Sequence, residues 1–136
     1  MHNLKLTLEI FLQKLHIRTV PLNEQPRRIA HQEATRTLCV TTLKMRITRE
    51  GDEAEDHFVR LLDDQTFETL DVYQLHEQEN SCSVVSTSFG EDAKTAKIYY
   101  VVGTALANPL ENEPQERRIL IFEVVERKLQ LVCSRD

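Results

Sequence analysis

The chain carries short apolar runs, rich in β-branched residues, that occur in the same order twice. Each run stops at turn residues before a helix of ordinary length could form, and no long segment keeps a helical period. The first set of runs and the second set are Arg28–Gln32, Thr37–Thr42, His57–Leu62 and Leu70–Leu75, then Ser83–Ser88, Lys97–Ala105, Ile119–Val125 and Lys128–Cys133. A repeat of four short strands is typical of successive blades of a β-propeller.

The two sets can be aligned at offsets of 55 to 62 residues. This alignment matches Ile29 with Val84, Leu38-Cys39-Val40 with Tyr100-Val101-Val102, Val59-Arg60-Leu61 with Leu120-Ile121-Phe122, and Val72 with Leu131. We therefore predict an all-β fold with about two four-stranded antiparallel blades plus one extra strand of a β-propeller, whose ring this chain does not close. The partial propeller is expected over residues 13–136, with the extra strand at 13–20 and the blades at 26–76 and 81–133, after an N-terminal segment at 1–12.

The extra strand is predicted because apolar and polar residues alternate over residues 15–20 until Pro21 ends the run. We expect it to have no partner earlier in the chain and to be the outer strand of a preceding blade. A tight turn is expected at Asp63-Asp64-Gln65-Thr66, where an aspartate carboxylate can accept hydrogen bonds from backbone amides two or three residues on.

Six strand residues are expected to be largely buried, namely Val40, Val59, Val101, Val102, Ile119 and Ile121. Val101 and Val102 point to opposite faces, because side chains alternate along a strand. Burial of both residues therefore requires one blade to pack on another.

Composition narrows the classes of function. The 136 residues include 17 Lys and Arg against 22 Asp and Glu, and the resulting net charge of −5 argues against an autonomous nucleic-acid binder. Cys39, Cys82 and Cys133 have no CxxC spacing, which favours reduced, core-facing thiols over a disulfide framework or a metal site. No stretch approaches the ~20 apolar residues of a membrane helix, and no signal peptide is found, so we expect a cytosolic or nuclear protein without membrane contact.

Patterns for catalysis, metals and cofactors are missing from the sequence. His16, His31, His57 and His76 have no metal-ligand spacing, and the serines lack the glycine-flanked elbow of a nucleophile. We therefore predict no enzymatic activity, no metal and no cofactor.

Charged clusters leave two interpretations open. Glu111, Glu113 and Glu116 lack the pattern of a calcium loop, which favours a solvated loop. The pairs Arg27-Arg28 and Arg117-Arg118 could bind phosphate weakly, although such pairs usually keep a loop soluble. Protein binding fits best, since propellers present loops on a rigid platform.

Several segments resemble a known family along nearly the whole chain, from about Glu9 to Leu131. They are Gln13–Leu22, Pro26–Ile29, Leu62–Glu68, Val102–Ala105, Pro109, Glu113-Pro114, Arg118-Ile119, Ile121-Phe122 and Lys128–Gln130. Together they are similar to the third β-propeller of the family of the large DNA-damage-binding protein and the large cleavage-and-polyadenylation factor. The segments HIRTVPL and DDQTFE are the most specific.

The resemblance implies an adaptor of cullin-4 ubiquitin ligases, with roles in ubiquitination and DNA repair and a location in the nucleus and cytoplasm. Its implied partners are propeller-type substrate receptors, other propeller chains that complete the ring, and nucleic acid only weakly or indirectly. Carried over position by position, it makes candidate receptor contacts of Ala105, Ala107, Pro109, Glu111 and Glu113.

The chain also departs from the family. The family has a long serine-rich insertion where Lys44–Asp56 is short, and its propeller continues beyond residue 136. Two alternatives to a receptor-binding scaffold therefore stay open, which are a truncated non-functional remnant and a nucleic-acid-binding module.

Overall fold

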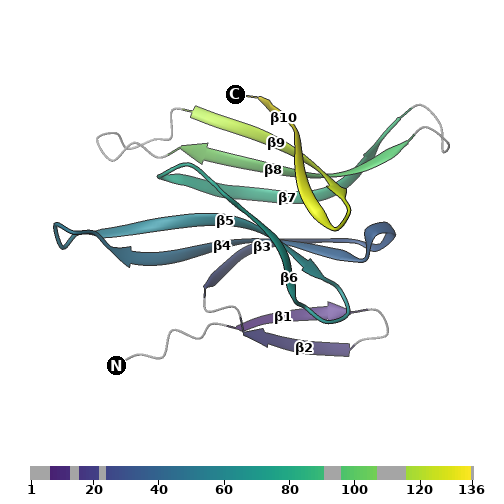
Figure 1. Ribbon diagram of the computed structural model, residues 1–136, viewed down its shortest axis with the longest axis horizontal. Helices are drawn as coiled ribbons and strands as arrows, with labels where there is room; N and C mark the ends of the chain where they lie inside the picture. The colour runs from purple at the N-terminus through teal and green to yellow at the C-terminus, as the bar shows by residue number, and fades with distance from the viewer. Residues whose placement is uncertain (1–6, 13–15, 22–23, 91–95, 107–115, 136) are drawn as a thin grey trace.

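The computed structural model describes residues 7–12, 16–21, 24–90, 96–106 and 116–135 and shows three stacked layers of β-structure (Figure 1). The strands are β1 (Thr7–Leu12), β2 (His16–Pro21), β3 (Gln25–Gln32), β4 (Thr37–Ile47), β5 (Glu53–Asp63), β6 (Thr69–Gln74), β7 (Glu79–Phe89), β8 (Lys97–Leu106), β9 (Glu116–Val125) and β10 (Lys128–Arg135). The helical content of the described residues is one 3₁₀ turn at Glu33–Thr35.

Two four-stranded antiparallel sheets confirm the predicted fold class. The first sheet has the order β3-β4-β5-β6, and the second sheet has the order β10-β9-β8-β7. Each sheet is thus a meander in which consecutive strands are neighbours, as in a propeller blade. The two sheets stack face to face without closing a ring or barrel (Figure 1).

The layer that precedes the first sheet is a hairpin rather than a single strand. β2 pairs with β1 from Leu12↔His16 to Thr7↔Pro21, so the prediction that this strand has no earlier partner is wrong. Leu8, Ile10 and Leu12 do keep a period of two, but the apolar Phe11 between them obscures it. Residues 13–15, where the strand was expected to begin, lie outside the described residues.

The strand registers confirm part of the repeat alignment. Ile29 lies opposite Val40 in the first sheet, and Val84 lies opposite Val102 in the second, as the alignment requires. The alignment of the third strands is wrong by one residue. Val40 pairs with Arg60 whereas Val102 pairs with Leu120, so Arg60 and Leu120 are the equivalent positions.

This shift exchanges the faces of the third strand, because the side-chain period of a strand is two. The equivalents of Val59 and Leu61 are therefore Ile119 and Ile121. The match of Val72 with Leu131 is also wrong. Val72 pairs with Arg60 and Ser134 pairs with Leu120, which makes Val72 and Ser134 equivalent.

β-Bulges recur at the same places in the two sheets. The first strands of the two sheets, β3 and β7, shift register between Pro26 and Arg28 and between Ser81 and Ser83. The last strands, β6 and β10, bulge at Leu70 and at Val132. Because a bulge bends and twists a strand locally, equivalent bulges give the two sheets the same curvature and let them nest.

The core lies between the two sheets. Cys39, Val59 and Leu61 of the first sheet pack there against side chains of the second sheet, namely Val84, Tyr100, Val102, Leu120 and Phe122. Residues 37–43 of β4 are buried on both faces, because the second sheet covers one face and the β1–β2 hairpin lies on the other side (Figure 1). Burial raises the pKa of the Cys39 thiol to about 12.

The predicted core is confirmed at Val40, Val59 and Val102, each of which is fully buried. It is wrong at Ile119, which is 49% exposed, and only partly right at Val101 and Ile121, which are half-buried. These three side chains point to the outer face of the second sheet, where no further layer of described residues packs. The thiols differ in the same way, since Cys39 is buried, Cys133 is half-buried and Cys82 is exposed.

Candidate protein-interaction surface

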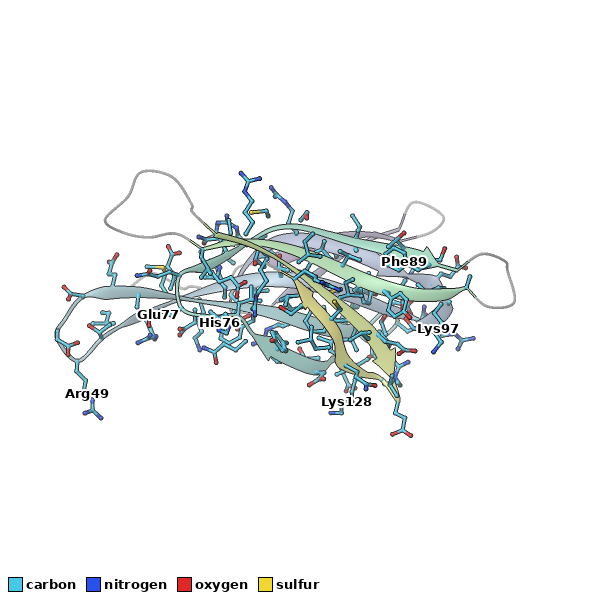
Figure 2. The ribbon with its side chains drawn as sticks, turned by 90° about the horizontal axis from the view of Figure 1, so that it is seen from above. Arg49, His76, Glu77, Phe89, Lys97 and Lys128 are labelled. Carbon is cyan, nitrogen blue, oxygen red and sulfur yellow. The ribbon has the colours of Figure 1, made fainter. Side chains whose placement is uncertain are left out.

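Connections between strands gather at the two ends of the stacked sheets. One end, called the rim here, holds the tip of the β4–β5 hairpin, the β6–β7 connection and the ends of β8 and β9, at the left of Figure 1. The other end holds the β3–β4, β5–β6 and β9–β10 turns. Figure 2 labels Arg49 and Glu77 towards the rim, and Phe89 and Lys97 towards the opposite end.

The opposite end confirms the predicted turn. Asp63 Oδ1 accepts hydrogen bonds from the backbone amides of Gln65 at 2.7 Å and Thr66 at 2.9 Å. Asp63 also forms an ion pair with Arg127 of the β9–β10 turn. This contact joins the turns of the two sheets.

A hollow of about 550 Å³ opens at the rim between the β4–β5 hairpin and the β6–β7 connection. It is lined by Met45, Thr48, Asp52, Glu53, Ala54, Glu55, Glu77, Gln78 and Asn80. Four of these nine residues are carboxylates and none is a cation. Of the cations on the same hairpin, Arg46 is paired with Asp56 at 2.9 Å, and Lys44 and Arg49 are not among the lining residues. The hollow therefore has a negative field suited to a basic partner.

One wall of the hollow is the turn from His76 to Glu79, whose two end residues are joined by two hydrogen bonds. The amide of Glu79 donates to the carbonyl of His76 at 3.0 Å, and the amide of His76 donates to Glu79 Oε1 at 2.9 Å. Between them, Gln78 has a φ of 64° in the left-handed region. Glu77 and Gln78 are exposed on this turn, whereas Glu79 is turned inward and fully buried.

The Glu79 carboxylate ties three strands together. Arg118 of β9 donates to it through Nε at 2.9 Å and Nη2 at 2.7 Å, and the hydroxyl of Thr104 in β8 donates to Oε2. Burial by itself would raise the pKa of Glu79, but these bonds and the Arg118 charge outweigh it and lower the pKa. Glu79 with its partners is called the Glu79 clamp below.

The first sheet has an equivalent clamp at Glu24, which is 5% exposed. Arg60 of β5 donates to its carboxylate through Nε at 2.7 Å and Nη2 at 2.5 Å. Burial would raise the pKa of Glu24, and the Arg60 hydrogen bonds and charge lower it overall. Thr42, the equivalent of Thr104, is near enough to favour the Glu24 charge, but its buried hydroxyl falls outside hydrogen-bond geometry.

The sequence-predicted contact residues adjoin this hollow only in part. Ala105 lies in β8, is 9% exposed, and pairs with Asn80, which lines the hollow. Ala107, Pro109, Glu111 and Glu113 lie outside the described residues. Sequence reasoning missed the hollow itself. Its signal in the sequence was the acidic run Asp52–Glu55 together with Glu77, but nothing in the sequence shows that these residues face each other.

The described part of the chain also bears on metal ions, phosphate groups and membranes. It holds no group of three or more His, Cys, Asp or Glu placed to bind a metal ion. Two of the four paired arginines make hydrogen bonds within the chain, since Arg118 belongs to the Glu79 clamp and the exposed Arg28 donates from Nε to the carbonyl of Cys82 at 3.1 Å. No helix among the described residues is long and apolar enough to span a membrane.

Known proteins resemble this chain over most of its length. DNA damage-binding protein 1 of Oryza sativa subsp. japonica is 53% identical over 125 residues, which cover 92% of this chain and 11% of the relative. DNA damage-binding protein 1a of Arabidopsis thaliana is 51% identical over the same shares. DNA damage-binding protein 1 of Drosophila melanogaster is 34% identical over 90% of this chain and 14% of its own length.

The chain thus spans about a tenth of the length of the plant relatives it matches. These similarities confirm the resemblance to the large DNA-damage-binding protein. A sequence model for the CPSF A subunit region matches residues 56–136, which is more than half of the chain. That match covers the second sheet and half of the first, and the chain therefore belongs to the CPSF A subunit region family.

Proposed function

We propose that this chain supplies a receptor-binding rim within a protein-interaction scaffold, the adaptor of cullin-4 ubiquitin ligases in ubiquitination and DNA repair. The observation that supports this most directly is the acidic hollow beside Asn80 and Ala105, from which β8 leads into the expected contact segment. The proposed partner is a propeller-type substrate receptor that presents a basic segment.

Electrostatic complementarity would give the rim its selectivity. The hollow holds Asp52, Glu53, Glu55 and Glu77, and the expected contacts add Glu111 and Glu113. Charges at the rim of an interface act mainly on encounter rate and specificity. Of the other expected contacts, the small residues Ala105 and Ala107 would allow close approach, and Pro109 would lower the entropy lost on binding.

The remaining parts of the proposal follow from the same scaffold role. The chain would have no enzymatic activity and no cofactor of its own. It would act in the nucleus and cytoplasm, and other propeller chains would complete the ring.

Co-precipitation with a propeller-type receptor of a cullin-4 ligase tests the proposal. The doubly substituted rim variants Glu53→Lys/Glu77→Lys and Glu111→Lys/Glu113→Lys should each weaken binding at least about tenfold and reduce its salt dependence. The control Glu68→Lys/Glu126→Lys makes the same charge change on exposed residues of turns at the opposite end. The proposal is wrong if the wild-type chain binds no receptor, or if rim and control variants bind equally well.

The name of the relatives also keeps a nucleic-acid-binding module as a second candidate. The net charge of −5 and the place of Arg118 in the Glu79 clamp favour protein binding instead. Salt-dependent retention of the wild-type chain on DNA, undiminished by the rim substitutions, would favour this second candidate.

A further inference from the structure

Glu79 stands apart from the other acidic residues at the rim. Glu77, Gln78 and Asn80 line the hollow, but Glu79 between them is fully buried and turned away from solvent. Figure 2 shows His76 and Glu77 side by side on the connection that Glu79 ends. A buried carboxylate is costly unless it is fully hydrogen-bonded, so its partners define what it holds in place.

The partners of Glu79 come from the β6–β7 connection and from the neighbouring strands β8 and β9. Glu79 Oε1 accepts from the His76 amide at 2.9 Å and from Arg118 Nη2 at 2.7 Å, so one oxygen joins the start of the turn to β9. Oε2 accepts from Arg118 Nε and from the Thr104 hydroxyl. We propose that Glu79 is a positioning residue for the acidic hollow, and that it sets where Glu77, Gln78 and Asn80 face the basic partner segment.

The turn needs such a tie because of its own backbone. Gln78 is a non-glycine residue at a φ of 64°, a conformation that persists only where the surroundings enforce it. Removing the carboxylate takes the acceptor from the His76 amide and leaves Arg118 as a buried unpaired charge. The wall can then relax, and a partner that binds the hollow must restore its order at the expense of affinity.

Glu24 provides a matched control within the same chain. It is buried, it is held by a bidentate arginine, and it occupies the equivalent position in the first sheet. No residue that lines the hollow adjoins Glu24 in sequence. Loss of this clamp should therefore destabilise the fold in a similar way without moving the wall of the hollow.

The inference about Glu79 rests on the proposed function, so its test combines two measurements on the full chain. The first measurement is the dissociation constant for the propeller-type receptor, and the second is hydrogen exchange of the His76 amide. Glu79→Leu, which leaves the His76 amide without a side-chain acceptor, should weaken binding and speed the exchange, each by at least about tenfold, whereas Glu24→Leu should change neither by more than about twofold. The urea midpoints of the two variants should fall by similar amounts.

A double variant distinguishes the effect of Glu79 on the position of the wall from its effect on the stability of the fold. Glu79→Leu with Arg118→Met removes the buried charges together, which can leave stability nearly unchanged. We expect its His76 amide still to exchange quickly and its binding still to be weak, because Leu offers no acceptor.

Equal effects of Glu79→Leu and Glu24→Leu on binding and exchange, or normal behaviour of the double variant, would overturn the positioning role. If the wild-type chain binds no receptor, the proposed function fails. The exchange of the His76 amide then still decides, by itself, whether Glu79 holds the wall of the hollow.

Discussion

Neighbouring residues of β9 have opposite surroundings. Leu120 and Phe122 point into the space between the sheets and are fully buried, whereas Ile119 and Ile121 point to the outer face. Ile119 is 49% exposed although it is as apolar as its neighbours. The contribution of each of these residues to the free energy of unfolding therefore depends on the face it occupies rather than on its hydrophobicity.

Substitutions on the two faces of β9 should lower the free energy of unfolding by different amounts. Leu120→Ala should cost about 2–5 kcal/mol, because it opens a cavity between the two sheets. Ile119→Ala, one residue away on the same strand, should cost less than about 1 kcal/mol, because much of its side chain is already in water. Urea unfolding of both variants measures the difference. Similar losses for the two would mean that the outer face is covered in solution.

At the scale of elements, each clamp joins strands that are not all neighbours. The backbone hydrogen bonds of a sheet connect only adjacent strands. Glu79 bonds to residues of β8 and β9 from the start of β7, and Glu24 reaches β5 from the start of β3. The arginines sit at different positions, since Arg60 is equivalent to Leu120 and not to Arg118. The guanidinium of Arg60 instead lies over the ring of Phe58, 5.7 Å from its centroid.

The clamps should make stability fall in acid. Both carboxyl groups have a pKa below the ordinary value of 4.5, so their unfolded forms bind protons first. Their contribution is complete well above pH 4.5 and is lost as the pH falls from there through the lowered pKa values. The urea midpoint of the wild-type chain should drop over this range, and the double variant Glu24→Gln/Glu79→Gln should show a shallower drop. Identical pH profiles would contradict this assignment.

The order of elements could be predicted from the sequence, but the register could not. Turn residues and short β-branched runs mark where each strand begins and ends. Register depends on which face is apolar, and Leu38-Cys39-Val40 and Ile119–Phe122 are apolar on both faces. A shift of one residue in β9 therefore changes nothing visible in the sequence, and only the pairing of Val102 with Leu120 reveals it.

The candidate site was predictable to a smaller extent. An acidic, partner-facing segment after Ala105 could be expected from family resemblance, and it remains a prediction. The hollow depends on Glu53 and Glu77, 24 residues apart, meeting across two connections. The burial of Glu79 was equally hidden, because it follows Glu77 and Gln78 in a run of polar residues. Nothing in the sequence distinguishes the buried Glu79 from its two exposed neighbours.

At the scale of the whole molecule, the two sides of the stack are unequal. The first sheet lies between the second sheet and the β1–β2 hairpin, and residues 37–43 of its central strand β4 are buried on both faces. The second sheet has an outer face that carries Val85, Phe89 and Ile119, each about half exposed. An apolar face of this kind promotes association.

We therefore expect self-association that grows with protein concentration. Size-exclusion chromatography with light scattering should show species larger than the 15.8 kDa chain at high concentration. Ile119→Lys places a charge on the outer face and should return the chain to a monomer without loss of cooperative unfolding. A monomer at every concentration would contradict the prediction, and unfolding of the wild-type chain without a cooperative transition would favour a non-functional remnant.

Hydroxyl and amide groups bridge the two sheets at three places along their length, from Thr37 to Tyr100 at 2.8 Å, from Ser81 to Thr41 at 2.8 Å and from Gln32 to Ser86 at 3.2 Å. Apolar packing is non-directional and tolerates sliding, whereas hydrogen bonds at separated points fix both translation and rotation. These contacts help to hold the angle between the two sheets, together with the apolar core and the ion pair of Asp63 with Arg127. In any assembly that continues this stacking, the angle between adjacent sheets determines how many sheets complete one revolution, so polar side chains between the sheets contribute to the size of the ring.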